Sequence, residues 1–304
     1  MQTCSLSWLH LFVAAPNFYN SEKKEICHGK KLCSSAALLF TVVIVGCAGS
    51  KQALPNHIDF NNTASVDAFL SVDEIRTMDS LDEIGRKLAG QDAVAWVASD
   101  SIQVDLPQKT LKELIGWVAQ GNLGDGYCIF YGKDSSGYYQ IARYDFSPDG
   151  MRRALARTEL PDGEVFELVK MNDSAYTAFR GYGLGEKVKY NTYILEENGQ
   201  YVFYAFPGST NDYVVLGGGI KLALGDSSWK AKVLHNGPVV MEWNSVAGNK
   251  VVRTSSLGDV PNEVDFAQYY IYERALPEQY IKTRKYLIGL LRNKDGKMNI
   301  FVVK

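Results

Sequence analysis

The feature that most constrains the fold is a series of short, aromatic-rich apolar runs separated by turn sequences from residue 127 onward. Residues 127–133 and 138–146 flank Asp134-Ser135-Ser136-Gly137, and residues 188–195 and 201–206 flank Asn198-Gly199. Asn-Gly between two such runs is the strongest local hairpin signal. Runs joined by tight turns pair as antiparallel strands, whereas a parallel sheet needs an alternation of strands and helices that is not seen here. The pattern therefore predicts a mainly antiparallel, β-rich region.

The remaining C-terminal runs continue this pattern. They cover residues 213–216, 220–224, 229–234, 239–243, 250–254, 264–273, 286–292 and 298–303. Gly217-Gly218-Gly219 precedes a strand rather than a helix, so a bulge or a close backbone crossing explains it better than a phosphate site. Between the first two hairpins, only residues 164–180 have helix potential.

The aromatic run 264–273 supplies the candidate ligand-facing residues Tyr269, Tyr270 and Tyr272. If the run is a strand, Tyr269 and Tyr270 point to opposite faces, and one of them could line a groove for sugar or peptide. Ordinary strand packing, which favours tyrosine, is the alternative.

Helical signals dominate before residue 127. An irregular helix is expected from Val66 to Ile75, and Ser80-Leu81-Asp82-Glu83 has the form of a capping box before a helix that Gly90 should end. Residues 92–98 and 102–106 are predicted strands. Thr110-Leu111-Lys112-Glu113 is a second capping box, after which residues 116–120 could be helix or strand. The expected class is α+β, with one domain over residues 65–304 that is helical first and β-rich from about residue 127.

The N-terminal region has the layout of an export signal. Lys30 and Lys31 lead into the apolar run 36–45, and small residues and polar sequence follow at once. The run is shorter than the roughly 20 residues that a membrane-spanning helix needs. We interpret residues 1–46 as a signal region, and the long segment 1–29 favours a true start nearer Lys30.

Ile44-Val45-Gly46-Cys47 resembles the lipobox of bacterial lipoproteins. The resemblance implies cleavage before Cys47, a lipid on that cysteine and a bilayer as partner, with residues 47–64 as the lipidated cysteine and a tether. Ala48 after the cysteine is similar to the outer-membrane-sorted class, which implies a protein of the cell envelope facing the periplasm. An ordinary signal peptide with an incidental cysteine is the alternative.

A second resemblance concerns the mature domain. The motifs that carry it are Tyr190-Asn191-Thr192-Tyr193, Phe206-Pro207-Gly208, Gly217-Gly218-Gly219 and Pro261-Asn262-Glu263-Val264-Asp265. Together they resemble a pattern in uncharacterised bacterial secreted proteins, and the resemblance implies no activity.

The numbers of cysteine, histidine and charged residues limit which kinds of site this chain can form. Four of the five cysteines lie at or before position 47, so Cys128 has no partner and is expected to be a buried core thiol. His57 and His235 are the only histidines after Cys47, too few for a recognisable zinc site, so we expect no metal and no cofactor. Without the four lysines and two glutamates that precede Cys47, 28 basic residues face 32 acidic ones, which gives no footprint for nucleic acid.

These observations favour a non-catalytic binding or scaffolding domain with an envelope protein or glycan as partner. The chain has no Gly-x-Ser-x-Gly nucleophile motif. The alternative is an envelope hydrolase that acts on polymer or peptide through residues that no motif reveals.

Overall fold

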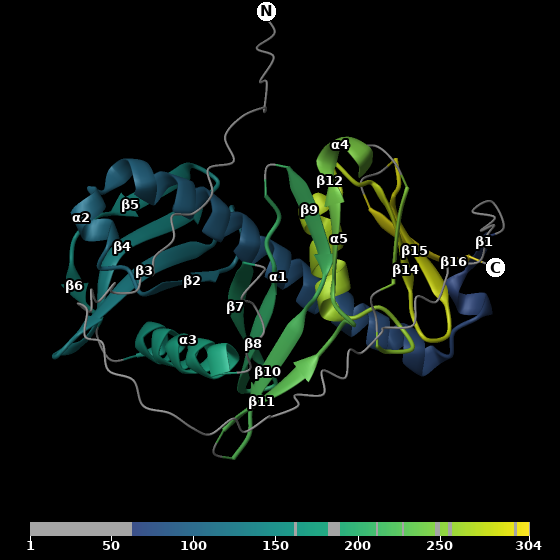
Figure 1. The fold of residues 1–304 in the computed structure, drawn as a ribbon, viewed down its shortest axis with the longest axis horizontal. Coiled ribbons are helices and arrows are strands. Elements are labelled where there is room, and N and C mark those ends of the chain that lie inside the picture. The colour runs from purple at the N-terminus through teal and green to yellow at the C-terminus, as the bar shows by residue number, and fades with distance from the viewer. Residues whose placement is uncertain are drawn as a thin grey trace, which may run out of the picture.

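One 34-residue helix, α1 (Val72–Asp105), runs along the molecule and contacts both of its lobes (Figure 1). The computed structural model describes residues 63–303, except 161–162, 182–188, 211, 227, 247–249, 255–256 and 295–296. The helix begins at a capping box. The Ser71 hydroxyl accepts a hydrogen bond from the Glu74 amide, and the Glu74 carboxylate accepts one from the Ser71 amide. This reciprocal pair satisfies two amides that the first turn would leave open.

Helix α1 continues beyond Gly90, where the sequence predicts its end, because its later residues pack against the rest of the domain. Its buried residues continue well past Gly90 and are Met78, Gly85, Leu88, Gln91, Asp92, Val94, Ala95, Ala98 and Ile102. The predicted stop at Gly90, the predicted strands 92–98 and 102–106 and the predicted capping box at Ser80 are therefore wrong. A Cβ at Gly90 would lie 2.9 Å from the Gly121 carbonyl oxygen, so this glycine allows a close approach rather than ending the helix.

The first lobe packs one antiparallel sheet between two helices. Its elements are α2 (Gln108–Leu111), β2 (Gly116–Gln120), β3 (Tyr127–Asp134), β4 (Gly137–Ser147), β5 (Gly150–Ala154), β6 (Thr158–Glu159) and α3 (Glu164–Gly181). The strand order is β2-β3-β4-β5, and β6 pairs with β4. Along β3, Cys128 and Phe130 pack with α1 residues, while Ile129 and Tyr131 pack with α3 residues on the other face.

Several predictions from the sequence can be compared with the elements observed in this lobe. The hairpin around residues 134–137 and the helix over 164–180 are confirmed, and residues 116–120 form a strand. The predicted capping box at Thr110 is wrong, because Thr110 lies inside α2, whose N-cap is Pro107 and makes no side-chain capping bond.

Cys128 lies in the core between α1 and the first sheet and is fully buried. Burial in these apolar surroundings raises the pKa of its thiol, so the reactive thiolate is disfavoured. We expect a thiol reagent to label Cys128 only after denaturation, as measured by mass spectrometry. Rapid labelling of the native protein would contradict this expectation.

The second lobe holds three sheets and the helix α5. Its elements are β1 (Thr63–Ser65), η1 (Val66–Ala68), β7 (Tyr190–Glu197), β8 (Gln200–Pro207), β9 (Tyr213–Gly217), β10 (Ile220–Leu224), β11 (Trp229–Val233), β12 (Pro238–Glu242), α4 (Trp243–Val246), β13 (Val251–Thr254), α5 (Glu263–Tyr272), β14 (Glu278–Lys282), β15 (Leu287–Arg292) and β16 (Met298–Val303). The sheet orders are β11-β10-β8-β7, β12-β9 and β1-β16-β15-β14-β13. With both lobes described, the fold is α+β with mainly antiparallel sheets, as predicted.

In this lobe a hairpin predicted from its turn residues is confirmed, whereas some predicted pairings between neighbouring strands are wrong. The Asn198-Gly199 hairpin is confirmed, and both turn residues have positive φ, 52° and 75°, as a type I′ turn requires. By contrast, β12 pairs with β9, and β13 pairs in parallel with β14, so the expectation that neighbouring runs pair antiparallel fails there. Strand β1 begins at Thr63, two residues inside the predicted tether.

The predicted aromatic strand 264–273 is wrong, because these residues form helix α5. Asn262 caps it: its side-chain oxygen accepts hydrogen bonds from the Val264 and Asp265 amides, and the Asp265 carboxylate accepts one from the Asn262 amide. Tyr269 and Tyr270 are therefore neighbours on a helix and not residues on opposite faces of a strand. Asn-x-x-Asp before an apolar run was the available signal, since it closely resembles a capping box.

Helices α1 and α5 cross at Gly85. A Cβ at this position would lie 2.4 Å from Phe266 Cβ and 2.9 Å from the Ala267 amide nitrogen. Leu88 of α1 and Val264 and Ala267 of α5 share one core at this crossing. The absence of a side chain at Gly85 lets the two backbones approach closely enough to close that core.

Candidate functional site

A cavity of about 350 Å³ lies where the middle of α1 meets the end of β2 and strand β7. We call it the α1 cavity, and it is lined by Arg86, Lys87, Gly90, Gln91, Gln120, Gly121, Asn122 and Leu195. This volume falls at the lower end of the range typical of small-molecule sites. Three separate stretches of the chain build its wall, so only the tertiary fold brings them together.

Two amide side chains form the inner wall of the α1 cavity. The Gln91 amide group donates to Gln120 Oε1 at 3.0 Å and to the Ile194 carbonyl at 3.2 Å. Gln120 Nε2 donates to the same carbonyl at 2.9 Å. Gln91 is 1% exposed, and its Oε1 is buried without a hydrogen-bond partner. The two amides therefore link α1 and β2 to the Ile194 carbonyl of β7.

Two cationic side chains, Arg86 and Lys87, lie at the rim of the α1 cavity, and each forms an ion pair with a carboxylate. Arg86 donates twice to Asp82, at 3.0 and 2.9 Å, and its guanidinium lies 5.0 Å from the centre of the Tyr270 ring. The hydrogen bonds to Asp82 raise the pKa of Arg86. Lys87 forms an ion pair with Glu83 at 2.8 Å. The rim is therefore close to neutral overall.

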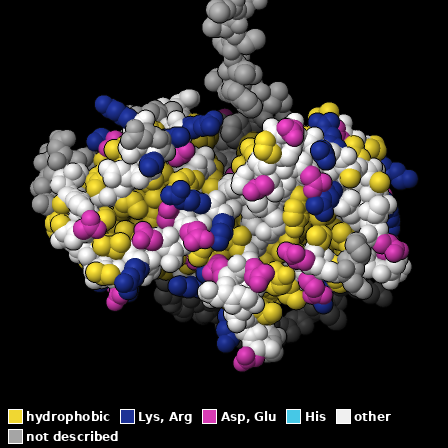
Figure 2. Space-filling view, turned by 180° about the vertical axis from the view of Figure 1, so that it is seen from behind, with side chains coloured by type: hydrophobic (Ala, Val, Ile, Leu, Met, Phe, Trp, Pro, Cys, Tyr) yellow, Lys and Arg dark blue, Asp and Glu magenta, His cyan; other side chains and the backbone are white. Residues whose placement is uncertain are grey.

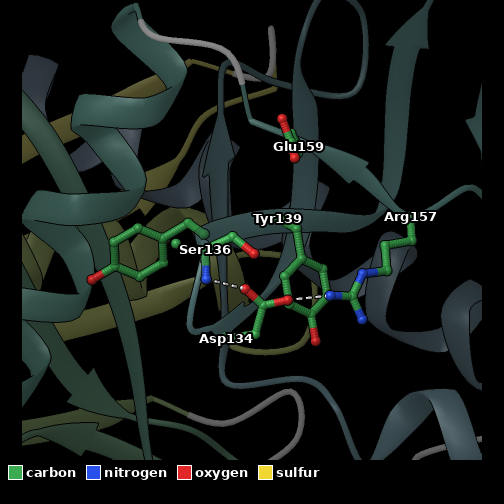
Figure 3. A pocket seen from close by; sticks show the side chains of 7 residues that line it. Asp134, Ser136, Tyr139, Arg157 and Glu159 are labelled. Carbon is green, nitrogen blue, oxygen red and sulfur yellow. Dashed lines mark hydrogen bonds and ion pairs between the residues drawn. The ribbon is translucent and has the colours of Figure 1, made fainter.

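A second, smaller cavity of about 210 Å³ lies at the tip of the β3–β4 hairpin beside β6. Figure 3 shows Asp134 between the Ser136 amide and Arg157, while Glu159 points away from them. The Arg157 guanidinium stacks 3.6 Å over the Tyr139 ring. The hydrogen bond from the Ser136 amide lowers the pKa of Asp134. This arrangement stabilises the hairpin tip, because Arg157 forms ion pairs with both Asp134 and Glu113.

The His235–Asp265 pair is buried in the second lobe and resembles part of a catalytic triad. His235 Nδ1 accepts a hydrogen bond from the Gly219 amide at 2.8 Å, so in the neutral ring the proton lies on Nε2, 3.2 Å from Asp265 Oδ1. Both side chains have zero exposure. Because both ring nitrogens are engaged and buried, this pair anchors the start of α5 rather than meeting a substrate. The Gly217–Gly219 segment is confirmed as a close backbone approach, since a Cβ at Gly219 would lie 2.9 Å from Val264.

A second polar cluster brings together two carboxylates, Glu197 and Glu263, that no sequence motif links. Lys221 Nζ lies 3.0 Å from Glu197 and 3.2 Å from Glu263. The Tyr204 hydroxyl lies 2.5 Å from Glu197 and 3.1 Å from Glu263. Burial raises the pKa of Tyr204, which keeps its proton available to the carboxylates. The cluster holds β8 and β10 to the start of α5.

The three predicted ligand-facing tyrosines do not meet in a groove. Tyr269 is fully buried in the core beneath the β14–β16 sheet, so the expectation that it faces a ligand is wrong. Tyr270 donates to Asp82, and the Tyr272 hydroxyl lies 2.7 Å from Ser209 Oγ. None of the three lines either cavity. Cys47, the predicted lipidation residue, lies outside the described residues.

Comparison with family models, curated proteins and solved structures found no match to this chain. Within the described residues, no helix is long and apolar enough to cross a membrane. In the same part of the chain, no group of three or more His, Cys, Asp or Glu side chains could hold a metal ion. The face in Figure 2 mixes basic and acidic side chains without a broad area of either sign.

Proposed function

We propose that this protein is a lipid-anchored protein of the bacterial cell envelope whose α+β domain binds a ligand or partner without catalysing a reaction. The observation that carries the proposal is the order of residues from Lys30 to Cys47: basic pair, short apolar run, small residue, cysteine. Cys47 would carry the lipid, and the domain would face the periplasm from the outer membrane.

The position of the folded part agrees with a tethered domain. Residues 48–62 separate Cys47 from β1, and fifteen residues reach at most about 50 Å. Strand β1 pairs with β16 at the edge of the five-stranded sheet, so the chain from the anchor joins the second lobe. The α1 cavity supports the binding half of the proposal, because its volume suits a small ligand.

No arrangement among the described residues favours the hydrolase alternative. The His235–Asp265 pair has no exposed atom, and Glu197 and Glu263 are engaged by Lys221 and Tyr204. A hydrolase needs a base that reaches the substrate within hydrogen-bond distance.

Replacing the anchor residue tests the proposal. We expect Cys47→Ser to release the protein from the membrane fraction or to block its processing, because the serine hydroxyl cannot replace the thiol to which the lipid is attached. Two or more acyl chains give stable attachment, so their loss should be plain in fractionation. Fractionation and intact-mass measurement of the purified protein read out both steps.

Cys33→Ser is the matched control, because Cys33 lies in the part of the signal region that processing would remove. We expect this variant to be processed and anchored like the unmodified protein. Unchanged membrane attachment together with an unchanged mature mass in Cys47→Ser would overturn the proposal.

A further inference from the structure

We propose that strand β12 pairs with β12 of a second copy of this chain, antiparallel and about a twofold axis at Val240. This inference goes beyond the proposed anchor and ligand binding, because it concerns how two copies of the domain associate. The pairing joins the two-stranded sheets of both copies into one sheet, in the order β9-β12-β12-β9. Two features carry it: backbone groups that match themselves across the axis, and a strand without basic side chains.

The hydrogen bonds of β9 show which backbone groups of β12 point outward. Val215 of β9 lies opposite Val240, and its amide donates to Ser209 Oγ at 2.9 Å instead of to β12. Two residues further on, the Gly217 amide donates to Gln268 Oε1 at 2.7 Å, and its carbonyl accepts from Gln268 Nε2 at 3.3 Å. In an antiparallel pair, a residue whose groups point away from the neighbouring strand lies opposite one that does the same. The amide and carbonyl of Val240 therefore point to the free edge of β12.

The two ends of this edge complete the set of outward groups. Pro238 and Glu242 lie two positions before and after Val240, so their backbone groups point the same way. Proline has no amide hydrogen, and the Glu242 carbonyl already accepts a hydrogen bond from Ser245 Oγ at 2.7 Å. The groups that remain are the Val240 amide and carbonyl, the Pro238 carbonyl and the Glu242 amide. None of these makes a hydrogen bond to another residue that the structure describes.

A second β12 supplies a partner for each of the remaining groups. With the axis at Val240, each Val240 amide donates to the carbonyl of the partner's Val240, and each Glu242 amide donates to the carbonyl of the partner's Pro238. Pro238, which lacks a donor, then lies opposite the one carbonyl that is already bonded. An unrelated extended peptide would bring an amide and a carbonyl to these two positions and leave both without a partner. The edge therefore matches itself better than it matches a general strand.

The side chains of β12 also permit this approach. Val240 is 54% exposed, and no residue of β12 is buried. By contrast, β5 and β11, each at the edge of its own sheet, carry basic residues of the kind that prevents pairing between molecules: Arg152 and Arg153 on β5, and Lys230 and Lys232 on β11. The only charged residue of β12, Glu242, lies opposite the partner's Pro238, so no like charges meet across the pair.

Disulfide cross-linking in the full-length protein tests the register. In the proposed pairing the Cα atoms of the two Val240 residues lie about 5.5 Å apart, within the range that a disulfide spans. We expect Val240→Cys to give a covalent dimer on mild oxidation, seen on a non-reducing gel above the level of the unmodified protein. Val233→Cys is the matched control, because Val233 is a 47% exposed valine on the edge strand β11. No gain of dimer from Val240→Cys, or an equal gain from the control, overturns the proposal.

Sedimentation equilibrium of the full-length protein in density-matched detergent measures the association itself. Val240→Pro removes an amide that makes no bond to β9, so we expect the variant to keep its fold and to associate at least about tenfold more weakly. Val240→Thr keeps the amide and favours a strand, so it should associate like the unmodified protein. Association by Val240→Pro equal to that of the unmodified protein overturns the proposal. So does a single-chain mass at every concentration, which would leave the edge to an extended segment of another protein. The cross-linking result does not depend on whether Val240→Pro folds.

Discussion

Gly85→Val should destabilise the domain by at least about 3 kcal/mol, the upper part of the range for overpacked cores. The reason is geometric. The first carbon of the new side chain would lie 2.4 Å from Phe266 Cβ, 2.9 Å from the Ala267 amide nitrogen and 3.0 Å from the Glu263 carbonyl oxygen. Two of these contacts are backbone atoms of α5, which cannot rotate away as a flexible side chain can. The helices must separate, and the core that they share must open.

Thermal unfolding followed by circular dichroism measures this effect. For a domain of this size, about 3 kcal/mol corresponds to a fall in melting temperature of about 10 °C. Gly181→Ala is the matched control, because Gly181 is also a helical glycine and a Cβ there meets nothing within 4 Å. We expect that control to be neutral or slightly stabilised, since alanine favours the helix. A melting temperature of Gly85→Val equal to that of the control would show that the α1–α5 crossing is not closely packed in solution.

Asp92→Asn should be more stable than the unmodified protein at pH 7, by up to about 3 kcal/mol, and the difference should shrink toward pH 4. Asp92 lies on α1 and is 5% exposed; its carboxylate accepts hydrogen bonds from Tyr193 and Asn191. Burial raises the pKa of Asp92 from 3.8 to about 6, although the hydrogen bonds from Tyr193 and Asn191 oppose the shift.

The direction of this pH dependence follows from the number of protons that the folded and unfolded states bind at Asp92. Between pH 4 and pH 6 the folded protein keeps a proton on Asp92 that the unfolded chain has released. Stability from this group therefore falls as pH rises through that window, and above pH 6 the fold carries a buried charge. Asparagine keeps a side-chain oxygen for Tyr193 and does not ionise, so the variant loses this pH dependence.

Denaturant unfolding at a series of pH values measures the difference between the two proteins. Comparing the variant with the unmodified protein cancels the contributions of the other titrating groups. Asp79→Asn, at an exposed position on the same helix, is the control. The difference in the free energy of unfolding between the two proteins should change from pH 4 to pH 7. If it does not, Asp92 is not a buried group with a raised pKa.

Local chemistry by itself determined the hairpins of this protein. Asn198 and Gly199 adopt the positive φ angles that a two-residue hairpin turn needs, and Asn and Gly are the residue types that accept such angles most readily. The same local reasoning gave the β3–β4 hairpin and the helix α3, and with them the α+β class. Turn residues act on their immediate neighbours, so sequence is enough to place them.

Tertiary structure decided everything that depends on a distant partner. Residues 92–98 could form a strand or a helix, and burial against the first sheet made them part of α1. Residues 264–273 carried a local helix signal in the Asn262 capping box, but only the packing of α5 on α1 across Gly85 shows which surface buries them. The α1 cavity likewise exists only because residues 86–91, 120–122 and 195 meet. An apolar run carries the same burial energy in either conformation, so the surface that covers it selects helix or strand.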